Sequence, residues 1–230
     1  PDFAKFGMDP TQGWTTDMIR LMTRRVMDIA ACTEKSVKVY LDDRLLPCRD
    51  FQQYMSLYLG DPSIQFRMYE RINERWEVGV AISPDESFHQ VSFVNGIYTS
   101  KGGKHVEYVV NQIAKKMCDW IDKRKKIKVK PTYVRENLSV FVLSVIENPS
   151  FDSQTKETLT TTSSKFGSKC EISDKFIERL SKSGIVDRII ELHEFKESKS
   201  LKKTDGRKTS SIRGIPKLDD ANWAGGPKSS

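Results

Sequence analysis

The segment 138–146 reads LSVFVLSVI, and it restricts the possible folds more strongly than any other part of the chain. It carries no charge, and most of its residues are β-branched or aromatic, which favours a strand. Apolar side chains stand at both odd and even positions, and this is typical of a strand that is buried on both faces. The fold must therefore contain a sheet in which this segment is a buried strand.

Four other segments have the character of strands. The runs 66–72 and 76–82 are separated by three polar residues and predict a hairpin, and 88–94 predicts a further strand. Segment 36–41 alternates apolar with other residues, as a half-buried strand does, and a pair of aspartates then turns the chain. We expect a mixed sheet of about four strands.

Helical spacing of apolar residues predicts helices over 15–31, 50–59, 104–123, 173–181 and 184–196. The first has Thr15 or Thr16 as its cap and an apolar face that we expect to be buried. That face comprises Met18, Leu21, Met22, Val26, Ile29 and Ala30. The long third helix follows Gly102-Gly103 and carries a broad apolar stripe that can cover a sheet. We predict an α+β domain with helices packed on one face.

Charge and composition change along the chain. Lys and Arg outnumber Asp and Glu by 38 to 31, a surplus that loosely favours nucleic acid. From residue 197 onward the chain is rich in Lys, Ser, Gly and Pro, the composition of a linker. The turn SKGG at 100–103 lacks the longer glycine-rich signature of a phosphate-binding loop, so we interpret it as the start of a helix.

The four cysteines are scattered without a CxxC pair, so the sequence predicts free thiols in a reducing compartment. His89, His105 and His193 are isolated, and no metal site is predicted. No stretch approaches the roughly 18 apolar residues that cross a bilayer. We therefore expect a soluble, intracellular protein with no membrane partner.

Four long strings of the sequence resemble one protein family. They are SFVNGIYTSKGGKHVEYVVNQI from Ser92, IENPSFDSQTKETLT from Ile146, KFGSKCEIS from Lys165 and IPKLDDAN from Ile215. With the order of the predicted elements, they resemble the transducer of eukaryotic-type (cellular or viral) type II DNA topoisomerases, whose ATPase domain is of the GHKL type. The resemblance extends over nearly the whole chain, although Trp223 stands where the family pattern leads us to expect a polar residue.

The resemblance implies a fold and a division of the chain. The fold would be a ribosomal-protein-type two-layer α+β sandwich, followed by C-terminal helices and a linker. Residues 1–12 would leave an absent GHKL ATPase domain, 13–196 would form the transducer, and 197–230 would lead to an absent TOPRIM domain. Nothing in the sequence resembles the family's nucleotide pocket, its magnesium site or its DNA-cleaving tyrosine. The chain alone is therefore not expected to turn over ATP or cut DNA.

Two groups of residues are candidate sites. In the family, Lys156 would touch the terminal phosphate of ATP, with Gln154 and Thr155 beside it. A lysine presents a compact charge with three donors, and a flexible loop would let it follow the phosphate. Without the family context, these three residues indicate only a solvated turn.

The second group is the basic cluster, which we define as Lys123, Arg124, Lys125 and Lys126. Its simplest interpretation is a solvated helix end, where cations complement the helix dipole. In the family, a basic loop at this position contacts the transported duplex. Such contacts would be made to phosphates, independent of sequence and sensitive to salt.

The resemblance implies a segment of an ATP-hydrolysing isomerase that couples ATP turnover to strand passage. It further implies ATP and Mg²⁺ in the parent enzyme, duplex DNA and the two neighbouring domains as partners, a homodimer, and a location in the nucleus or, for a viral enzyme, in a cytoplasmic factory or virion. One alternative is a stand-alone nucleic-acid-binding module of ribosomal-protein-like fold, which would have no use for Lys156. Another is a relative in a chaperone or mismatch-repair ATPase, which would lack the basic cluster and the DDAN string.

Overall fold

The computed structural model describes residues 2–61 and 63–205, so the part of the predicted linker 197–230 that follows residue 205 lies outside the described residues. The chain divides into two compact units at residues 190 and 191. The first unit contains the sheet and both candidate sites.

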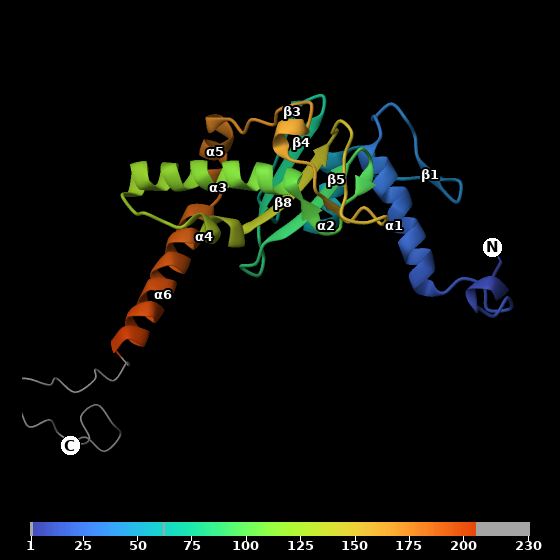
Figure 1. Cartoon of the computed structure of the whole chain (residues 1–230), viewed down its shortest axis with the longest axis horizontal. Helices are drawn as coiled ribbons and strands as arrows, with labels where there is room; N and C mark the ends of the chain where they lie inside the picture. The colour runs from blue at the N-terminus through green and yellow to red at the C-terminus, as the bar shows by residue number, and fades with distance from the viewer. Residues whose placement is uncertain (1, 62, 206–230) are drawn as a thin grey trace, which may run out of the picture. The chain divides into compact units, whose positions relative to one another are not determined.

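A mixed five-stranded sheet forms the centre of the first unit (Figure 1). Its order is β3 (Arg67–Asn73), β4 (Trp76–Ile82), β8 (Leu138–Ser144), β5 (His89–Val94) and β6 (Ile97–Tyr98). All neighbours are antiparallel except β5 and β8, which run parallel. The predicted hairpin and the predicted buried strand are confirmed.

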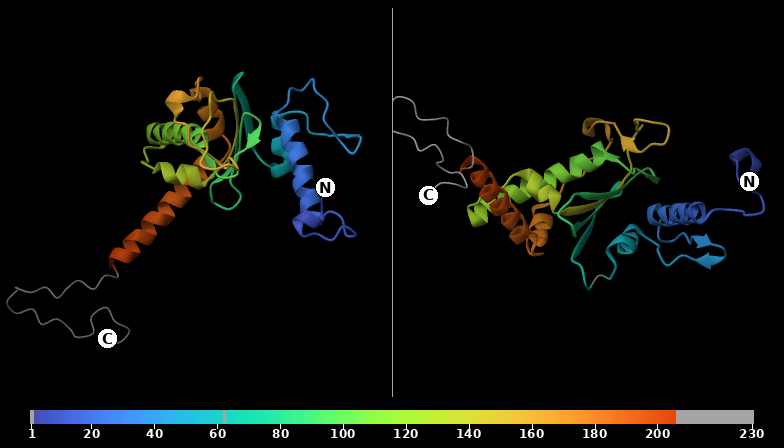
Figure 2. Two further views of the ribbon diagram at one scale, coloured as in Figure 1. Left: turned by 45° about the vertical axis from the view of Figure 1, so that its right-hand side comes forward. Right: turned by 90° about the horizontal axis from the view of Figure 1, so that it is seen from below.

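Helices cover both faces of this sheet, so the prediction of helices on one face is wrong (Figure 2). On one face, Phe141 of β8 and Phe93 of β5 pack in one cluster with residues of α2 (Phe51–Leu59). On the other, Trp76 lies in register with Ser144, and its ring packs against Tyr108 of α3 (Lys104–Lys125) at 6.1 Å. The reason lies in β8 itself, because a strand that is apolar on both sides needs cover on both sides.

The helix α1 (Thr16–Cys32) begins where the sequence predicts, with the side chain of Thr15 accepting from the Met18 N–H. Its predicted buried face is mostly exposed, however: Leu21 and Ile29 are each 55% exposed. The predicted strand 36–41 is reduced to β1 (Tyr40–Leu41), which pairs only with β2 (Arg44–Leu45). Together these elements leave an apolar surface without cover in the described residues.

Several smaller elements complete the described chain. α4 (Pro131–Glu136) was not predicted, although Pro131 suits a first helical position. α5 (Asp174–Ser181) is capped by Ser173 as predicted, and α6 (Ile185–Asp205) runs past the predicted end at residue 196. Two short 3₁₀ helices, η1 (Ala4–Phe6) and η2 (Ser163–Lys165), lie in loops.

All four cysteines are free thiols, as predicted. Burial raises the pKa of Cys118 to about 11 and those of Cys32 and Cys170 to about 12. Among the described residues there is no group of three His, Cys, Asp or Glu side chains that could hold a metal ion. Within the same residues, no helix has the length and apolar character that a membrane span requires.

A buried polar network lies beneath the start of α3. The Thr99 Oγ1 is 2.6 Å from the Ser92 Oγ and 3.2 Å from the His105 Nε2. His105 is 0% exposed, and burial lowers its pKa to about 3. The imidazole is therefore neutral in the fold, where a charged ring would lack solvation.

We predict that the two faces of the sheet contribute comparably to stability. Replacing Phe51 in α2 with Ala should lower the free energy of unfolding by about 3–5 kcal/mol, and Met117→Ala in α3 by about 2–5 kcal/mol. Both side chains are fully or almost fully buried. Leu57→Ala is the control, because Leu57 is half exposed and its loss should stay within about 0.5 kcal/mol. Chemical denaturation measures all three, and a neutral Phe51→Ala would contradict the packing of α2 on the sheet.

We also predict that His105 makes the fold sensitive to acid. Its pKa is about 3 in the fold, below the ordinary value of 6.5, so only the unfolded chain binds this proton between those pH values. The stability is fully present above pH 6.5 and declines as the pH falls toward 3. In His105→Gln the decline in this window should be shallower by up to about 1.4 kcal/mol per pH unit. Urea titrations at several pH values measure the slope, and equal slopes would refute the assignment.

Candidate functional site

The residues Gln154, Thr155 and Lys156 form the tip of a closed loop. Its ends meet at an antiparallel bridge between Phe151 and Leu159. The Asp152 N–H donates to the Thr158 carbonyl oxygen at 3.2 Å, and the Thr158 N–H donates to the Asp152 Oδ1 at 3.1 Å. The base of the loop is therefore held by its own hydrogen bonds.

At the tip, the Lys156 ammonium is available to an anion. Lys156 is exposed and takes a left-handed backbone conformation with φ of 58°. Its N–H donates to the Ser153 carbonyl oxygen at 3.1 Å, and its Nζ lies 5.9 Å from the centre of the Phe151 ring. None of the ion pairs among the described residues involves Lys156. A cation on a constrained tip of this kind suits a phosphate group.

The stem of the loop pairs with the chain just before α3. β7 (Gly102–Gly103) runs parallel to β9 (Thr158–Leu159), and the Lys101 N–H donates to the Glu157 carbonyl oxygen at 3.0 Å. The sequence predicts the helix start after Gly103 but gives no sign of this pairing. Strands of two residues have no periodicity that a sequence could reveal.

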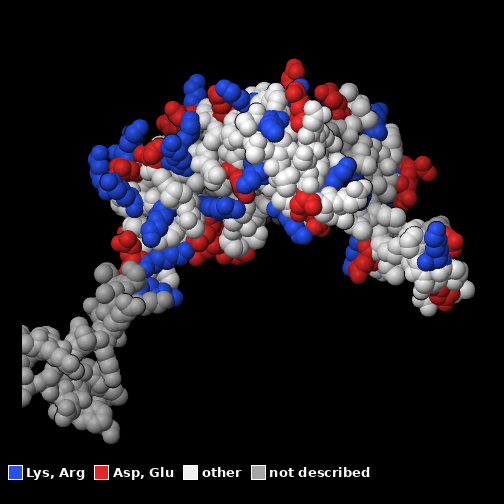
Figure 3. All heavy atoms as spheres, viewed as in Figure 1, with Lys and Arg blue, Asp and Glu red and all other residues white. Residues whose placement is uncertain are grey.

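The basic cluster lies at the other end of α3. Lys123, Arg124 and Lys125 occupy its last turn, and Lys126 caps it in a left-handed conformation, with its N–H donating to the Asp122 carbonyl oxygen. All four side chains are exposed, and no ion pair found in the described part of the chain includes them. Figure 3 shows Lys and Arg side chains gathered over this end of the helix.

One acidic group that senses the charge of the basic cluster is Asp174. The Asp174 carboxylate lies 2.7 Å from the Lys116 Nζ. This hydrogen bond and the charge of Lys116 lower the pKa of Asp174, and the charge of Lys123 adds to the effect. Asp174 is thus already paired with Lys116, and no ion pair in the described part of the chain joins it to the basic cluster.

The two candidate sites are far apart. The stem of the loop pairs with residues 101–103, directly before α3, whereas the basic cluster ends this 22-residue helix, which is about 33 Å long at 1.5 Å per residue. In Figure 1 the yellow segment around residue 155 lies near β5, and the labelled α3 runs away from it. The structure therefore joins the sites through one helix and does not bring them together.

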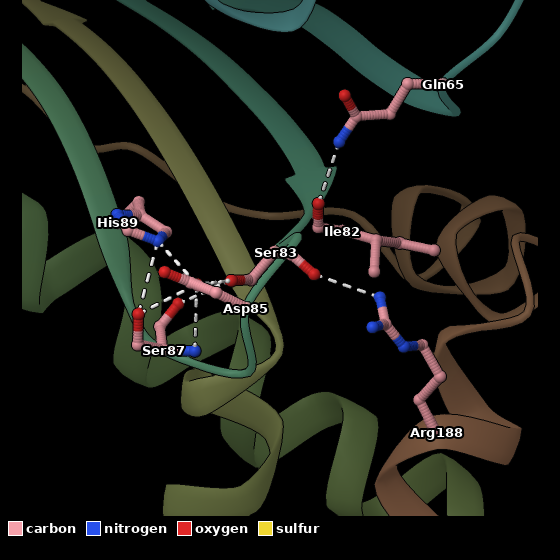
Figure 4. Close-up of polar contacts among 7 residues, drawn as sticks. All are labelled: Gln65, Ile82, Ser83, Asp85, Ser87, His89 and Arg188. Carbon is pink, nitrogen blue, oxygen red and sulfur yellow. Dashed lines mark hydrogen bonds and ion pairs between the residues drawn. The ribbon is translucent and has the colours of Figure 1, made fainter.

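A further cluster combines Asp85, Ser87 and His89 between β4 and β5 (Figure 4). The Asp85 Oδ1 lies 2.7 Å from the His89 Nε2, and the Ser87 Oγ lies 3.2 Å from the same nitrogen. A hydrolytic triad needs the serine and the carboxylate on different ring nitrogens. This geometry excludes such a triad in the described arrangement.

The side chains of Asp85, Ser87 and His89 instead stabilise the loop between β4 and β5. The Ser83 Oγ donates to the Asp85 Oδ1, and its carbonyl oxygen accepts from the Arg188 guanidinium at 2.9 Å. The hydrogen bonds from His89, Ser87 and Ser83 hold the pKa of Asp85 well below its usual range. Gln65 donates to the Ile82 carbonyl oxygen at 3.0 Å and ties the same corner from the other side (Figure 4).

Comparisons with known proteins agree with the sequence strings. The sequence model of the DNA gyrase B family matches residues 49–209. DNA topoisomerase 2 of Drosophila melanogaster is 47% identical in an alignment of 237 residues that covers all of this chain and 16% of that protein. The chain thus spans about one sixth of the length of this relative.

Two solved structures share the fold. The ATPase region of Saccharomyces cerevisiae topoisomerase II matches with a TM-score of 0.73 and 42% identity, covering 83% of this chain and 48% of that chain. The ATPase and transducer domains of DNA topoisomerase II from Balamuthia mandrillaris match with a TM-score of 0.72 and 44% identity, covering 79% and 46%. The resemblance inferred from the sequence is confirmed, and the chain belongs to the DNA gyrase B family of type II DNA topoisomerases.

Proposed function

We propose that this chain is the transducer segment of an ATP-dependent type II DNA topoisomerase and couples ATP binding and hydrolysis to strand passage. One observation carries the proposal: an exposed lysine lies near one end of α3 and a cluster of four exposed cations lies at the other, and none of the five has an ion pair within the described part of the chain. A stand-alone nucleic-acid-binding module would account for the cluster but not for a constrained lysine tip at the far end of the helix.

At the ATP end, the proposed role of Lys156 is to donate hydrogen bonds to the terminal phosphate, with Gln154 and Thr155 beside it. ATP would supply the negative charge that the tip recognises and the free energy that is released on hydrolysis. Nearly complete switching between two states requires about 5.5 kcal/mol of differential binding, more than one exposed lysine provides. The neighbouring ATPase domain would therefore supply most nucleotide contacts, and with them the site for Mg²⁺.

At the DNA end, the basic cluster would contact the phosphates of the duplex. No acceptor or fixed fork of donors among these four side chains is arranged to read base edges, so binding would be independent of sequence. Each phosphate contact releases condensed counterions, and the affinity should fall steeply with salt. This behaviour suits an enzyme that acts on any duplex.

The exposed apolar surface of α1 and β1 suggests where the ATPase domain lies. Ile19, Leu21, Met22 and Ile29 on α1 are 41–55% exposed, and Tyr40 of β1 is 52% exposed. These elements precede residue 49, where the family match begins. We propose that the preceding ATPase domain covers this surface, which would explain why a helix with the spacing of a buried one is exposed here.

The remaining expectations belong to the same proposal. Residues 1–12 would leave the ATPase domain, 13–196 would form the transducer, and the segment from 197 would lead to the TOPRIM domain, although the described α6 continues through this boundary. The parent enzyme would be a homodimer of the nucleus or, if viral, of a cytoplasmic factory or virion.

The first prediction of this proposal concerns ATP turnover in the full-length protein. Lys156→Ala should lower kcat for ATP hydrolysis about 10²-fold, because it removes a donor to the charge that develops in the transition state. Lys165→Ala removes an exposed lysine from the same segment and should leave kcat unchanged. A coupled ATPase assay measures both, and equal rates for Lys156→Ala and the parent would refute the role of the loop.

The second prediction concerns DNA binding by this chain. Changing all four residues of the basic cluster to Ala should flatten the slope of log K against log salt by roughly three to four. The control removes four exposed cations elsewhere in the described residues: Lys38, Arg44, Arg49 and Lys165. Fluorescence anisotropy with two duplexes of unrelated sequence measures the slopes. Equal slopes for the two quadruple variants would show that binding follows net charge and that the cluster is only a solvated helix end.

A further inference from the structure

Gly103 is in unusually close contact with the stem of the Lys156 loop. A Cβ built on Gly103 would lie 2.4 Å from the Leu159 carbonyl oxygen and 2.5 Å from the Leu159 nitrogen. These are backbone atoms of β9, which cannot rotate away as a side chain can. The φ of Gly103 is 130°, a conformation that suits glycine alone. The stem can therefore reach α3 only because position 103 has no side chain.

A second contact joins the same two segments, residues 101–103 and the stem of the loop, and we call their contact the junction. The Lys101 Nζ lies 2.6 Å from the Glu157 Oε2, and the backbone groups of the two residues are also hydrogen-bonded. Because the ion pair is partly exposed, it contributes little to stability, but it holds the two segments in one orientation. Glu157 is the residue directly after Lys156, and Lys101 is three residues before α3 begins.

The far side of the stem is fixed in the core. Leu159 is 1% exposed, and Phe151 pairs with it across the loop. Gly102 is also buried, and it lies opposite Thr158 in the β7–β9 pair. The loop is therefore attached to α3 along a short stretch of paired backbone, and only the tip, residues 153–156, projects beyond it.

We propose that Gly103 and the Lys101–Glu157 pair are positioning residues that make the Lys156 loop and α3 move as one body. A displacement of the tip by a phosphate is then transmitted to the basic cluster at the opposite end of the helix. This inference rests on the proposed function, and it assigns the coupling to a junction that neither candidate site contains.

A rigid body that joins the two sites would link their binding free energies. If they share one rigid body, duplex DNA at the basic cluster must change the affinity for nucleotide by the same factor as nucleotide changes the affinity for DNA. Coupling of this kind typically amounts to about 5- to 150-fold. Loosening the junction should lower this factor toward one without removing either binding site.

The experiment uses the full-length protein and a non-hydrolysable ATP analogue. The coupling factor is the ratio of the analogue's Kd without and with saturating duplex DNA. We expect several-fold coupling in the parent, loss of the coupling when the basic cluster is changed to Ala, and a factor within about two-fold of one in Gly103→Ala. The last variant should still bind DNA alone with the affinity of the parent.

Gly102→Ala is the matched control. Gly102 also has a positive φ, of 76°, but its added Cβ would meet only side-chain atoms, at 3.4 Å or more. This variant carries backbone strain in the same strand without displacing β9, so it should retain the coupling of the parent. If Gly103→Ala keeps the parental coupling factor, or if Gly102→Ala loses it equally, the inference is overturned.

A charge exchange tests the junction should Gly103→Ala fail to fold. Lys101→Glu places two carboxylates together and should lower the coupling factor, and the double variant Lys101→Glu/Glu157→Lys should restore it. A double variant no better than Lys101→Glu would count against the junction. The parent and Lys156→Ala test the proposed function itself. If the parent shows no coupling and Lys156→Ala binds the analogue as tightly as the parent, the proposed function is rejected, and this inference with it.

Discussion

The whole arrangement depends on one constraint, the double-sided burial of β8. A strand with Phe141 on one face and Val142 on the other can be stable only between two apolar layers. That requirement places α2 against one face and α3 against the other, and it fixes the axis of α3 relative to the sheet. This packing also determines where the candidate sites lie, because the stem of the Lys156 loop pairs with the chain just before α3 and the basic cluster ends the helix.

A helix that moves as a rigid body needs firm attachment at the end where a displacement enters it, and the two ends of α3 differ in how they are attached. The start of α3 is held by paired backbone and by the buried network of Ser92, Thr99 and His105. The last turn and the cap at Lys126 are exposed and carry cations that form no ion pair within residues 2–61 and 63–205. The start of α3 is thus the more firmly held of its two ends, and its last turn carries exposed positive charge.

The sequence predicted the elements whose apolar residues form a clear pattern along the chain. It failed where contacts with distant segments determine the structure. The strand 76–82 and the helix from 104 were predicted almost to their observed ends because their apolar residues recur every two, or every three to four, positions. The strand 138–146 was predicted because its residues are apolar on both faces. The covered face of α1 was predicted wrongly, since spacing shows that a face is apolar but not whether a neighbour covers it. The pairing of β7 with β9 depends on Gly103 meeting a backbone more than fifty residues away, and no local pattern encodes that contact. The residues of both candidate sites came from resemblance, and chemistry alone would have left Lys156 in a solvated turn.

The state of the native thiols has a practical consequence for watching this molecule move. With pKa values of about 11 to 12, Cys32, Cys118 and Cys170 are almost wholly protonated near neutral pH. Cys48 is buried, and burial raises the pKa of its thiol as well. We therefore expect all four to react slowly with maleimides or iodoacetamides. A cysteine introduced at an exposed position of the loop tip or beyond the last turn of α3 would therefore take up a dye first, in an otherwise unaltered chain. The protein is in this sense ready for site-specific labelling, and the two ends of its long helix can be followed optically without first removing its own cysteines.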